Sequence, residues 1–170
     1  MGFFSRLMGG SDEQTTAASE FEILAPVSGE LVHLENTNDP AFSSRAVGDG
    51  VAVVPQEGTV CAPVSGTVAA LFPTEHALGI MSDDSSAQVM LHIGIDTVKL
   101  EGKGFHALVA QGDHVDAGQP LVEVDFDAVR AAGFDPTVFV IVCERSENST
   151  LREHASGPVA AKEPVIWLSE

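Results

Sequence analysis

From residue 21 onward, every apolar run of the chain is short and is bounded by Gly, Pro or Asp clusters. Such punctuation is typical of β-strands joined by tight turns. The phrase A-P-V-S-G occurs twice, at residues 25–29 and at residues 62–66. Pro limits ladder pairing at the start of a strand and Gly permits a tight bend, so this repeated corner predicts two similar β-units folded on each other. We therefore expect an all-β antiparallel sandwich or barrel with minimal helix.

Short segments rich in Val, Ile, Leu and Phe have the length and composition of strands. They span residues 21–24, 30–34, 51–54, 66–72, 87–95, 120–124, 137–142 and 164–168. The phrase G-D-H-V-D-A-G-Q-P-L at residues 112–121 has a similar turn-strand-turn character. From residue 21 onward, a helical pattern, of about one short turn, is expected only over residues 126–133.

Composition narrows the class of protein. The chain has 170 residues, which suits one domain, and its 44% hydrophobic content supports a sizeable core and excludes global disorder. With 25 acidic against 8 basic residues, the net charge of −17 excludes nucleic-acid binding, because like charges repel a phosphate backbone. Cys61 and Cys143 lack the spacing of a zinc site and are expected to be buried thiols.

The first twenty residues differ from the remainder. Phe3, Phe4, Leu7 and Met8 fall at helical spacing beside Arg6, and a polar segment with Gly-Gly follows. We expect a flexible tail (1–20) before the folded domain (21–170). Two readings of residues 1–8 remain open: an amphipathic helix that contacts a membrane surface or a membrane-bound partner, or a frayed tail. With no signal-peptide pattern and no apolar run near ~20 residues, a cytoplasmic location is expected.

Two histidines flank a strong turn signal. His76 and His92 lie at equal distances on either side of S-D-D-S-S, residues 82–86. A five-residue loop would pair His76 with His92 across an antiparallel hairpin, where directly opposed side chains share a face. The hairpin therefore predicts two facing imidazoles among aliphatic neighbours, whereas a slip of one residue would separate them.

Three uses of such a pair are open on the residues alone. One ring can accept a phosphoryl group on a nitrogen while the other stabilises the incoming oxygens, both can ligate zinc, or both can be structural. Gly94 lets backbone approach closely, so that a carbonyl there can take the Nδ1 proton of His92 and leave Nε2 as the nucleophile. Thr74 is placed to orient His76 through its hydroxyl, and Asp96 can place a carboxylate nearby.

The chain resembles the glucose-type enzyme IIA component of the bacterial phosphoenolpyruvate-dependent sugar phosphotransferase system. The resemblance covers almost everything from residue 21 onward, and its most specific block is residues 89–105. It is carried by I-L-A-P-V-S-G-E-L-V, V-G-D-G-V-A-V-V-P, A-P-V-S-G-T-V, F-P-T-E-H-A, L-H-I-G-I-D-T-V, K-L-E-G-K-G-F and G-D-H-V-D-A-G-Q-P-L. It implies an antiparallel β-sandwich with a duplicated hybrid motif.

The resemblance also implies roles for residues. His92 would receive a phosphoryl group at Nε2 from the histidine-containing phosphocarrier protein (HPr) and pass it to a cysteine of a glucose-type IIB domain of a membrane permease. His76 would stabilise the group in transfer, and Thr74 would orient His76. The expected partner-binding residues around the site are Phe42, Phe72, Val47, Met90 and Asp96. No intrinsic cofactor or metal is expected beyond the covalent phosphate, and zinc would bind His76 and His92 only at an interface completed by a partner.

Two departures and several alternatives accompany this interpretation. Ser86 stands where the family signature usually has Gly, and the acidic excess is larger than the family leads us to expect. A biotinyl or lipoyl carrier module is one alternative, although no lysine lies in its M-K-M or D-K-A setting. A zinc-dependent hydrolase is another, although the residue two after His92 is Gly94 and a third ligand is missing. Regulated enzymes or transporters that bind according to phosphorylation state are a further class of partner.

Overall fold

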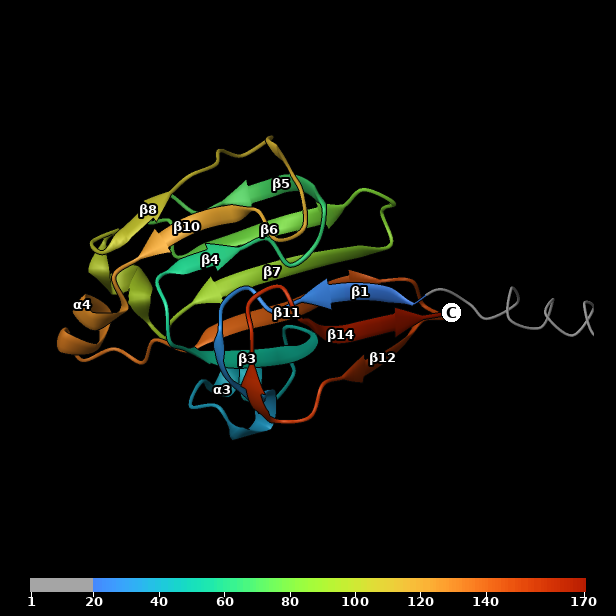
Figure 1. The fold of residues 1–170 in the computed structure, drawn as a ribbon, viewed down its shortest axis with the longest axis horizontal. Coiled ribbons are helices and arrows are strands. Elements are labelled where there is room, and N and C mark those ends of the chain that lie inside the picture. The colour runs from blue at the N-terminus through green and yellow to red at the C-terminus, as the bar shows by residue number, and fades with distance from the viewer. Residues whose placement is uncertain (1–19) are drawn as a thin grey trace, which may run out of the picture.

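Three antiparallel sheets form residues 20–170, the part of the chain that the computed structural model describes (Figure 1). The eight-stranded sheet contains, in spatial order, β13 (Gly157–Val159), β2 (Gly29–His33), β3 (Asp49–Pro55), β11 (Val138–Arg145), β7 (Ala87–Ile93), β6 (Ala77–Ser82), β5 (Gly66–Leu71) and β9 (His114–Val115). One smaller sheet contains β1 (Phe21–Leu24), β14 (Pro164–Ser169) and β12 (Thr150–Glu153). The other contains β4 (Thr59–Cys61), β10 (Pro120–Val124) and β8 (Phe105–Ala107).

Helix is confined to short pieces in the described residues. They are α3 (Pro40–Ser43), α4 (Phe126–Ala131) and the 3₁₀ turns η1 (Leu34–Asn36) and η2 (Thr97–Leu100). The expected all-β architecture is therefore confirmed, and α4 lies within the predicted helical segment. We did not predict α3, which begins where the Asp39 carboxylate accepts hydrogen bonds from two backbone N–H groups and Pro40 opens the helix.

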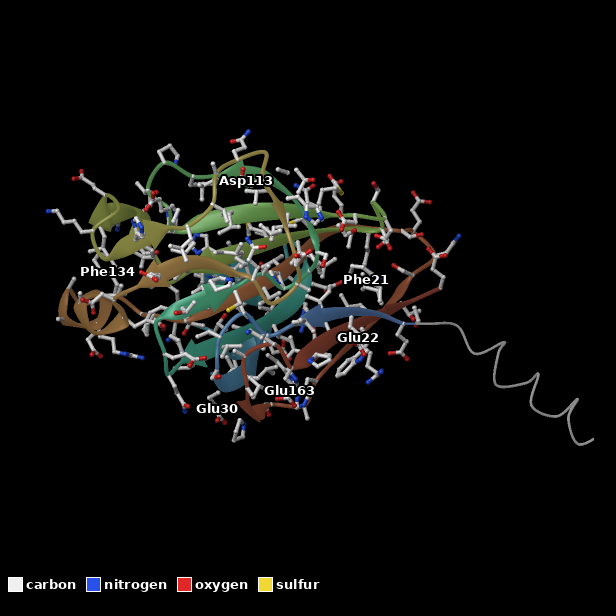
Figure 2. All side chains as sticks on the ribbon, turned by 45° about the horizontal axis from the view of Figure 1, so that its top comes forward. Phe21, Glu22, Glu30, Asp113, Phe134 and Glu163 are labelled. Carbon is white, nitrogen blue, oxygen red and sulfur yellow. The ribbon has the colours of Figure 1, made fainter. Side chains whose placement is uncertain are left out.

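The main core lies between the large sheet and the two smaller ones. On β7, Ala87, Val89, Leu91 and Ile93 point into this core, and the alternate residues point to the opposite face of the sheet. A second, smaller apolar cluster covers that opposite face beneath α3. Acidic side chains such as Glu30, Asp113 and Glu163 lie at the periphery (Figure 2). The large sheet thus has one face on the main core and one face partly open.

The two A-P-V-S-G phrases meet in the centre of the fold. The backbone N–H of Leu24 donates to the carbonyl of Pro63, at 2.9 Å, and the N–H of Cys61 donates to the carbonyl of Pro26, at 2.7 Å. These bonds are reciprocal, because each joins the residue before one phrase to the Pro of the other. The predicted folding of two similar β-units on each other is therefore present in the backbone.

A steric constraint explains why each phrase ends in glycine. A Cβ on Gly29 would lie 1.9 Å from the carbonyl oxygen of Val54, and a Cβ on Gly66 would lie 2.0 Å from that of Met81. Any side chain at these positions would push two paired strands apart. The repeated Gly therefore marks two equivalent close approaches of backbone to backbone.

Some expectations need correction or fall outside the described residues. Cys61 is buried as expected, but Cys143 is only half-buried, because it lies on the partly open face of the large sheet, packed against the second apolar cluster. The tail predicted for residues 1–20 lies outside the described residues except for Glu20, and so does the amphipathic helix of residues 1–8. Over residues 20–170, none of the helices has the length and apolar character needed to cross a membrane.

Candidate phosphoryl-transfer site

The register of the β6–β7 hairpin differs from the predicted one by a single residue. Ala77, and not His76, pairs with His92. The prediction was wrong because Ser82 continues β6, which leaves a turn of residues 83–86 with an even number of residues. The buried hydroxyl of Ser82 accepts a hydrogen bond from the N–H of Ala87, at 3.1 Å. This bond joins the last residue of β6 to the first residue of β7, so a polar residue ends the strand.

The two imidazoles nevertheless face each other. Their ring centroids lie 5.1 Å apart and their planes are nearly perpendicular, at 86°. His76 lies just before β6, after Glu75 in the left-handed backbone region (φ 61°), so strand alternation does not set the direction of its side chain. Its carbonyl still accepts from the N–H of Ile93, at 2.7 Å, which keeps His76 beside the end of β7.

One nitrogen of His92 is held by backbone. Its Nδ1 lies 2.8 Å from the carbonyl oxygen of Gly94, two residues along the chain. A carbonyl can only accept a hydrogen bond, so Nδ1 carries the proton and the neutral ring keeps its lone pair on Nε2. Burial lowers the pKa of His92, which favours this neutral form. His92 is therefore oriented as a nucleophile through Nε2.

The second imidazole is buried and held by a hydroxyl. His76 is 3% exposed, and its Nδ1 lies 2.6 Å from the Oγ1 of Thr74. Burial, with a smaller effect from the charge of His92, lowers the pKa of His76 to about 4. His76 is thus uncharged at neutral pH and enters the site as a hydrogen-bonding group, not as a cation.

Aromatic rings line both histidines. Phe42 of α3 lies 5.2 Å from His92, centroid to centroid, and stacks on Phe139 of β11 at 4.4 Å. Phe72 lies edge-on to His76 at 5.4 Å. Phe72 is 47% exposed, whereas Phe42 is only 5% exposed and supports the site from below. Phe72 therefore lies at the surface of the site, whereas Phe42 is buried next to His92.

The remaining expected partner-binding residues differ in position. Met90 is half-buried and shares the outer face of β7 with His92. Asp96 is exposed, with a left-handed backbone (φ 60°), and its charge raises the pKa of His92 against the larger effect of burial. Val47 is 39% exposed in the loop between α3 and β3.

Two residues of the site were missed by the sequence analysis. Phe139 pairs with His92 across the β11–β7 ladder, and its only signal was its place in the apolar segment 137–142. Asp39 caps α3 and exerts a negative field on His92. The Asp39-Pro40 pair is a helix-start signal and would have indicated this short helix.

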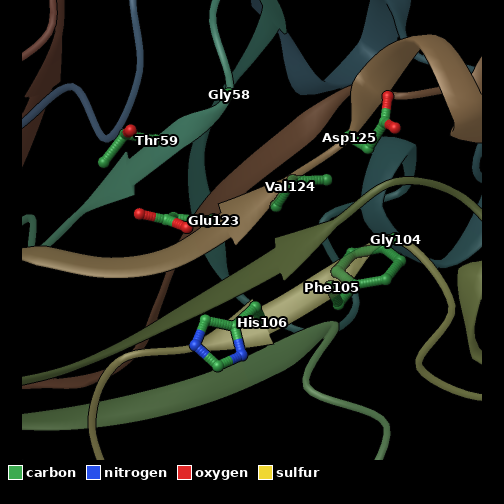
Figure 3. A pocket seen from close by; sticks show the side chains of 8 residues that line it. All are labelled: Gly58, Thr59, Gly104, Phe105, His106, Glu123, Val124 and Asp125. Carbon is green, nitrogen blue, oxygen red and sulfur yellow. The ribbon is translucent and has the colours of Figure 1, made fainter.

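Within residues 20–170, there is no cluster of three or more His, Cys, Asp or Glu side chains that could hold a metal ion. The two facing imidazoles supply two ligands, and a tetrahedral zinc site needs more. A pocket of about 530 Å³ lies apart from the two histidines, where exposed His106 of β8 pairs with Glu123 of β10 (Figure 3). It contains neither His76 nor His92.

The family model for phosphoenolpyruvate-dependent sugar phosphotransferase system, EIIA 1, matches residues 21–148. The chain is 42% identical to a glucose-specific EIICBA component of Streptococcus pneumoniae over 144 residues, and 39% identical to a β-glucoside-specific EIIBCA component of Bacillus subtilis over 170 residues. These matches cover 85% and 99% of this chain, but only 20% and 28% of those relatives.

A solved structure agrees with these matches. The glucose permease IIA of Mycoplasma capricolum superposes with a TM-score of 0.80 and 34% sequence identity, covering 88% of this chain and 96% of that one. The family carries a covalent phosphate on a histidine. The agreement favours this resemblance over the biotinyl-module and zinc-hydrolase alternatives. The chain therefore belongs to the EIIA 1 family of the phosphoenolpyruvate-dependent sugar phosphotransferase system, as a phosphotransferase component of that system.

Proposed function

We propose that this chain carries a phosphoryl group on Nε2 of His92 between a histidine of the phosphocarrier protein HPr and a cysteine of a IIB domain. The observation that carries the proposal is the bond from His92 Nδ1 to the Gly94 carbonyl, because it leaves Nε2 unprotonated and pointing away from the strand's own backbone. Family membership supplies the class of reaction.

The proposed transfer needs no intrinsic cofactor. The Nε2 lone pair of His92 forms a bond to phosphorus as the phosphorus–nitrogen bond of the donor breaks, and the donor ring keeps that electron pair. In the second step a cysteine thiolate of the IIB domain attacks phosphorus, and the Nε2–phosphorus bond breaks back to a lone pair. The proton stays on Nδ1, donated to the Gly94 carbonyl, throughout, so His92 needs no separate acid or base.

His76 is proposed to stabilise the phosphoryl oxygens in transfer, above all in delivery to the IIB domain. When the Thr74 hydroxyl donates to Nδ1 of His76, Nε2 of His76 carries the proton and can donate to a group on His92. Preorganised donors of this kind stabilise charge in transfer. Because its pKa is about 4, His76 is also a weak base at neutral pH, so it does not activate water to hydrolyse the phosphohistidine.

Both partners must reach the same nitrogen, so the docking face is proposed to be shared. Phe72, Val47, Met90 and Asp96 form its apolar and acidic parts, and exposed apolar groups around a reactive centre suit such an exchange. Regulated enzymes or transporters could use the same face in the unphosphorylated state, since a phosphoryl group adds about −1.5 to −2 charges. Zinc would bind the two histidines only where such a partner supplies further ligands.

A cytoplasmic location is part of this proposal. It is supported by the two free thiols, Cys61 and Cys143, which suit a reducing compartment. It also follows from the proposed partners, because HPr and the IIB domain would have to meet this chain on the same side of the membrane.

The test is incubation with phosphoenolpyruvate, the first enzyme of the system and HPr, followed by addition of a purified IIB domain. We expect one acid-labile phosphate per chain, none in His92→Ala, and a charged His76→Gln that fails to deliver phosphate to the IIB domain. Labelling of His92→Ala by HPr would overturn the assignment of the acceptor. Normal delivery by His76→Gln would overturn the role of His76.

A further inference from the structure

The Gly94 carbonyl that holds His92 is itself held in place. Gly94 lies between two peptide units, and all four of their polar groups have a partner. In the first unit the Ile93 carbonyl accepts from the hydroxyl of Thr97, at 2.5 Å, and the Gly94 N–H donates to the carbonyl of Thr137, at 2.8 Å. In the second the Gly94 carbonyl accepts from His92, and the Ile95 N–H donates at 2.9 Å to a backbone carbonyl.

That last acceptor is the carbonyl of Asp135, in the segment before β11. The Asp135 carboxylate in turn accepts from the N–H and the hydroxyl of Thr137, at 2.9 Å and 2.5 Å, so this segment forms a closed turn. Apart from the His92 ring, Thr97 is the one side chain within residues 20–170 that bonds directly to the two peptide units around Gly94.

Thr97 also touches Gly94 through its methyl group. A Cβ built on Gly94 would lie 2.3 Å from Cγ2 of Thr97, and Gly94 has a left-handed backbone (φ +82°). Thr97 is 0% exposed. If its hydroxyl were removed, the buried Ile93 carbonyl would lose a donor that bulk water could not readily replace. The hydroxyl and methyl of Thr97 therefore restrict the rotation of both peptide units.

We propose that Thr97 is a positioning residue for the phosphoryl transfer. Through its bond to the Ile93 carbonyl and its packing on Gly94, it aims the Gly94 carbonyl at Nδ1 of His92 and so keeps the reactive lone pair on Nε2. The proposal rests on the function proposed above, but it concerns the unphosphorylated ring and can be measured without any phosphoryl donor.

The test compares Thr97→Val with Thr97→Ser. Val keeps the shape of Thr and removes the hydroxyl, whereas Ser keeps the hydroxyl. Loss of one buried hydrogen bond should slow charging of His92 by HPr about five- to tenfold in Thr97→Val, and Thr97→Ser should stay within about twofold of the wild type. Ser82→Ala, which removes a buried hydroxyl at the far end of the same hairpin, is the matched control and should leave the rate unchanged.

The deciding readout is the tautomer of His92, observed by nitrogen NMR of histidine-labelled protein. We expect a pure Nδ1–H ring in the wild type, Thr97→Ser and Ser82→Ala, and a measurable share of the Nε2–H form in Thr97→Val. If Thr97→Val does not fold, Thr97→Ala removes the same hydroxyl with less bulk and replaces it in the comparison.

An unchanged tautomer in Thr97→Val overturns the proposal, even if the variant charges more slowly, because Thr97 would then be only structural. A slow Thr97→Ser with a mixed tautomer also overturns the part assigned to the hydroxyl. Failure of the wild type to accept phosphate would instead overturn the proposed function, and the tautomer measurement would still decide the role of Thr97.

Discussion

Acid should destabilise the folded chain through His76, and His76→Gln should remove that part of the effect. The pKa of His76 falls from 6.5 to about 4 on folding, because burial disfavours the charged ring. Below its ordinary pKa the unfolded chain therefore binds a proton that the folded chain does not, so stability is full above about pH 6.5 and is lost as the pH falls toward about 4. This linkage amounts to about 2 kcal/mol near pH 5 and at most about 3 kcal/mol below about pH 4.

The assay is urea unfolding of the wild type and His76→Gln at a series of pH values between about 7 and about 4.5. The carboxylates common to both proteins cancel in the difference, so we expect the stability gap between wild type and variant to shift by about 2 kcal/mol in favour of the variant across this range. His106→Gln, at an exposed histidine of β8, controls for the loss of one imidazole. A gap that stays constant with pH would refute the assignment of His76 as a buried neutral ring.

Three further changes test other parts of the account. Thr74→Val removes the hydroxyl that holds His76 and should slow delivery to the IIB domain about three- to tenfold, with recovery in Thr74→Ser; equal rates in all three proteins would contradict the positioning of His76. Phe139→Ala creates a cavity at the fully buried position beside His92 and should lower the free energy of unfolding, measured by urea titration, by about 3–5 kcal/mol. A loss under about 1 kcal/mol would show that the ring is not packed as described. Raising salt from about 0.1 M to about 1 M should increase the urea midpoint, because the net charge of −17 repels itself and salt screens it; a falling midpoint would contradict this.

The parts of the site that the sequence predicts are local ones. Gly94 and Thr74 each lie two residues from the histidine that they contact, so a short extended segment already places them within reach. The strand candidates and the two A-P-V-S-G corners are also local patterns, and the structure contains them. These contacts could be predicted because they join residues close in sequence, within the backbone of one or two strands.

The hairpin register shows where that reasoning stops. The prediction treated Ser82 as the first residue of the turn because Ser is a turn former, but its hydroxyl is buried and closes the ladder instead. The rings still meet because His76 lies outside the regular strand, after the left-handed Glu75. The correct conclusion about facing rings therefore came from a register that was wrong by one residue.

Long-range neighbours were beyond the sequence. Phe139 and Asp39 approach His92 from segments far away along the chain, and their approach depends on the strand order β3–β11–β7. A single sequence indicates which segments are strands, but many strand orders are compatible with the same apolar pattern. The burial of Phe42 follows from the same cause, because Phe139 provides the ring on which it stacks.

The most direct test of the central claim is to locate the phosphate after charging by HPr, using phosphorus and nitrogen NMR of histidine-labelled protein. The account predicts a single phosphohistidine at His92, bonded through Nε2, with the Nδ1 proton still hydrogen-bonded to the Gly94 carbonyl. A phosphate bonded through Nδ1, or one carried by another residue while His92 remains unmodified, would contradict it.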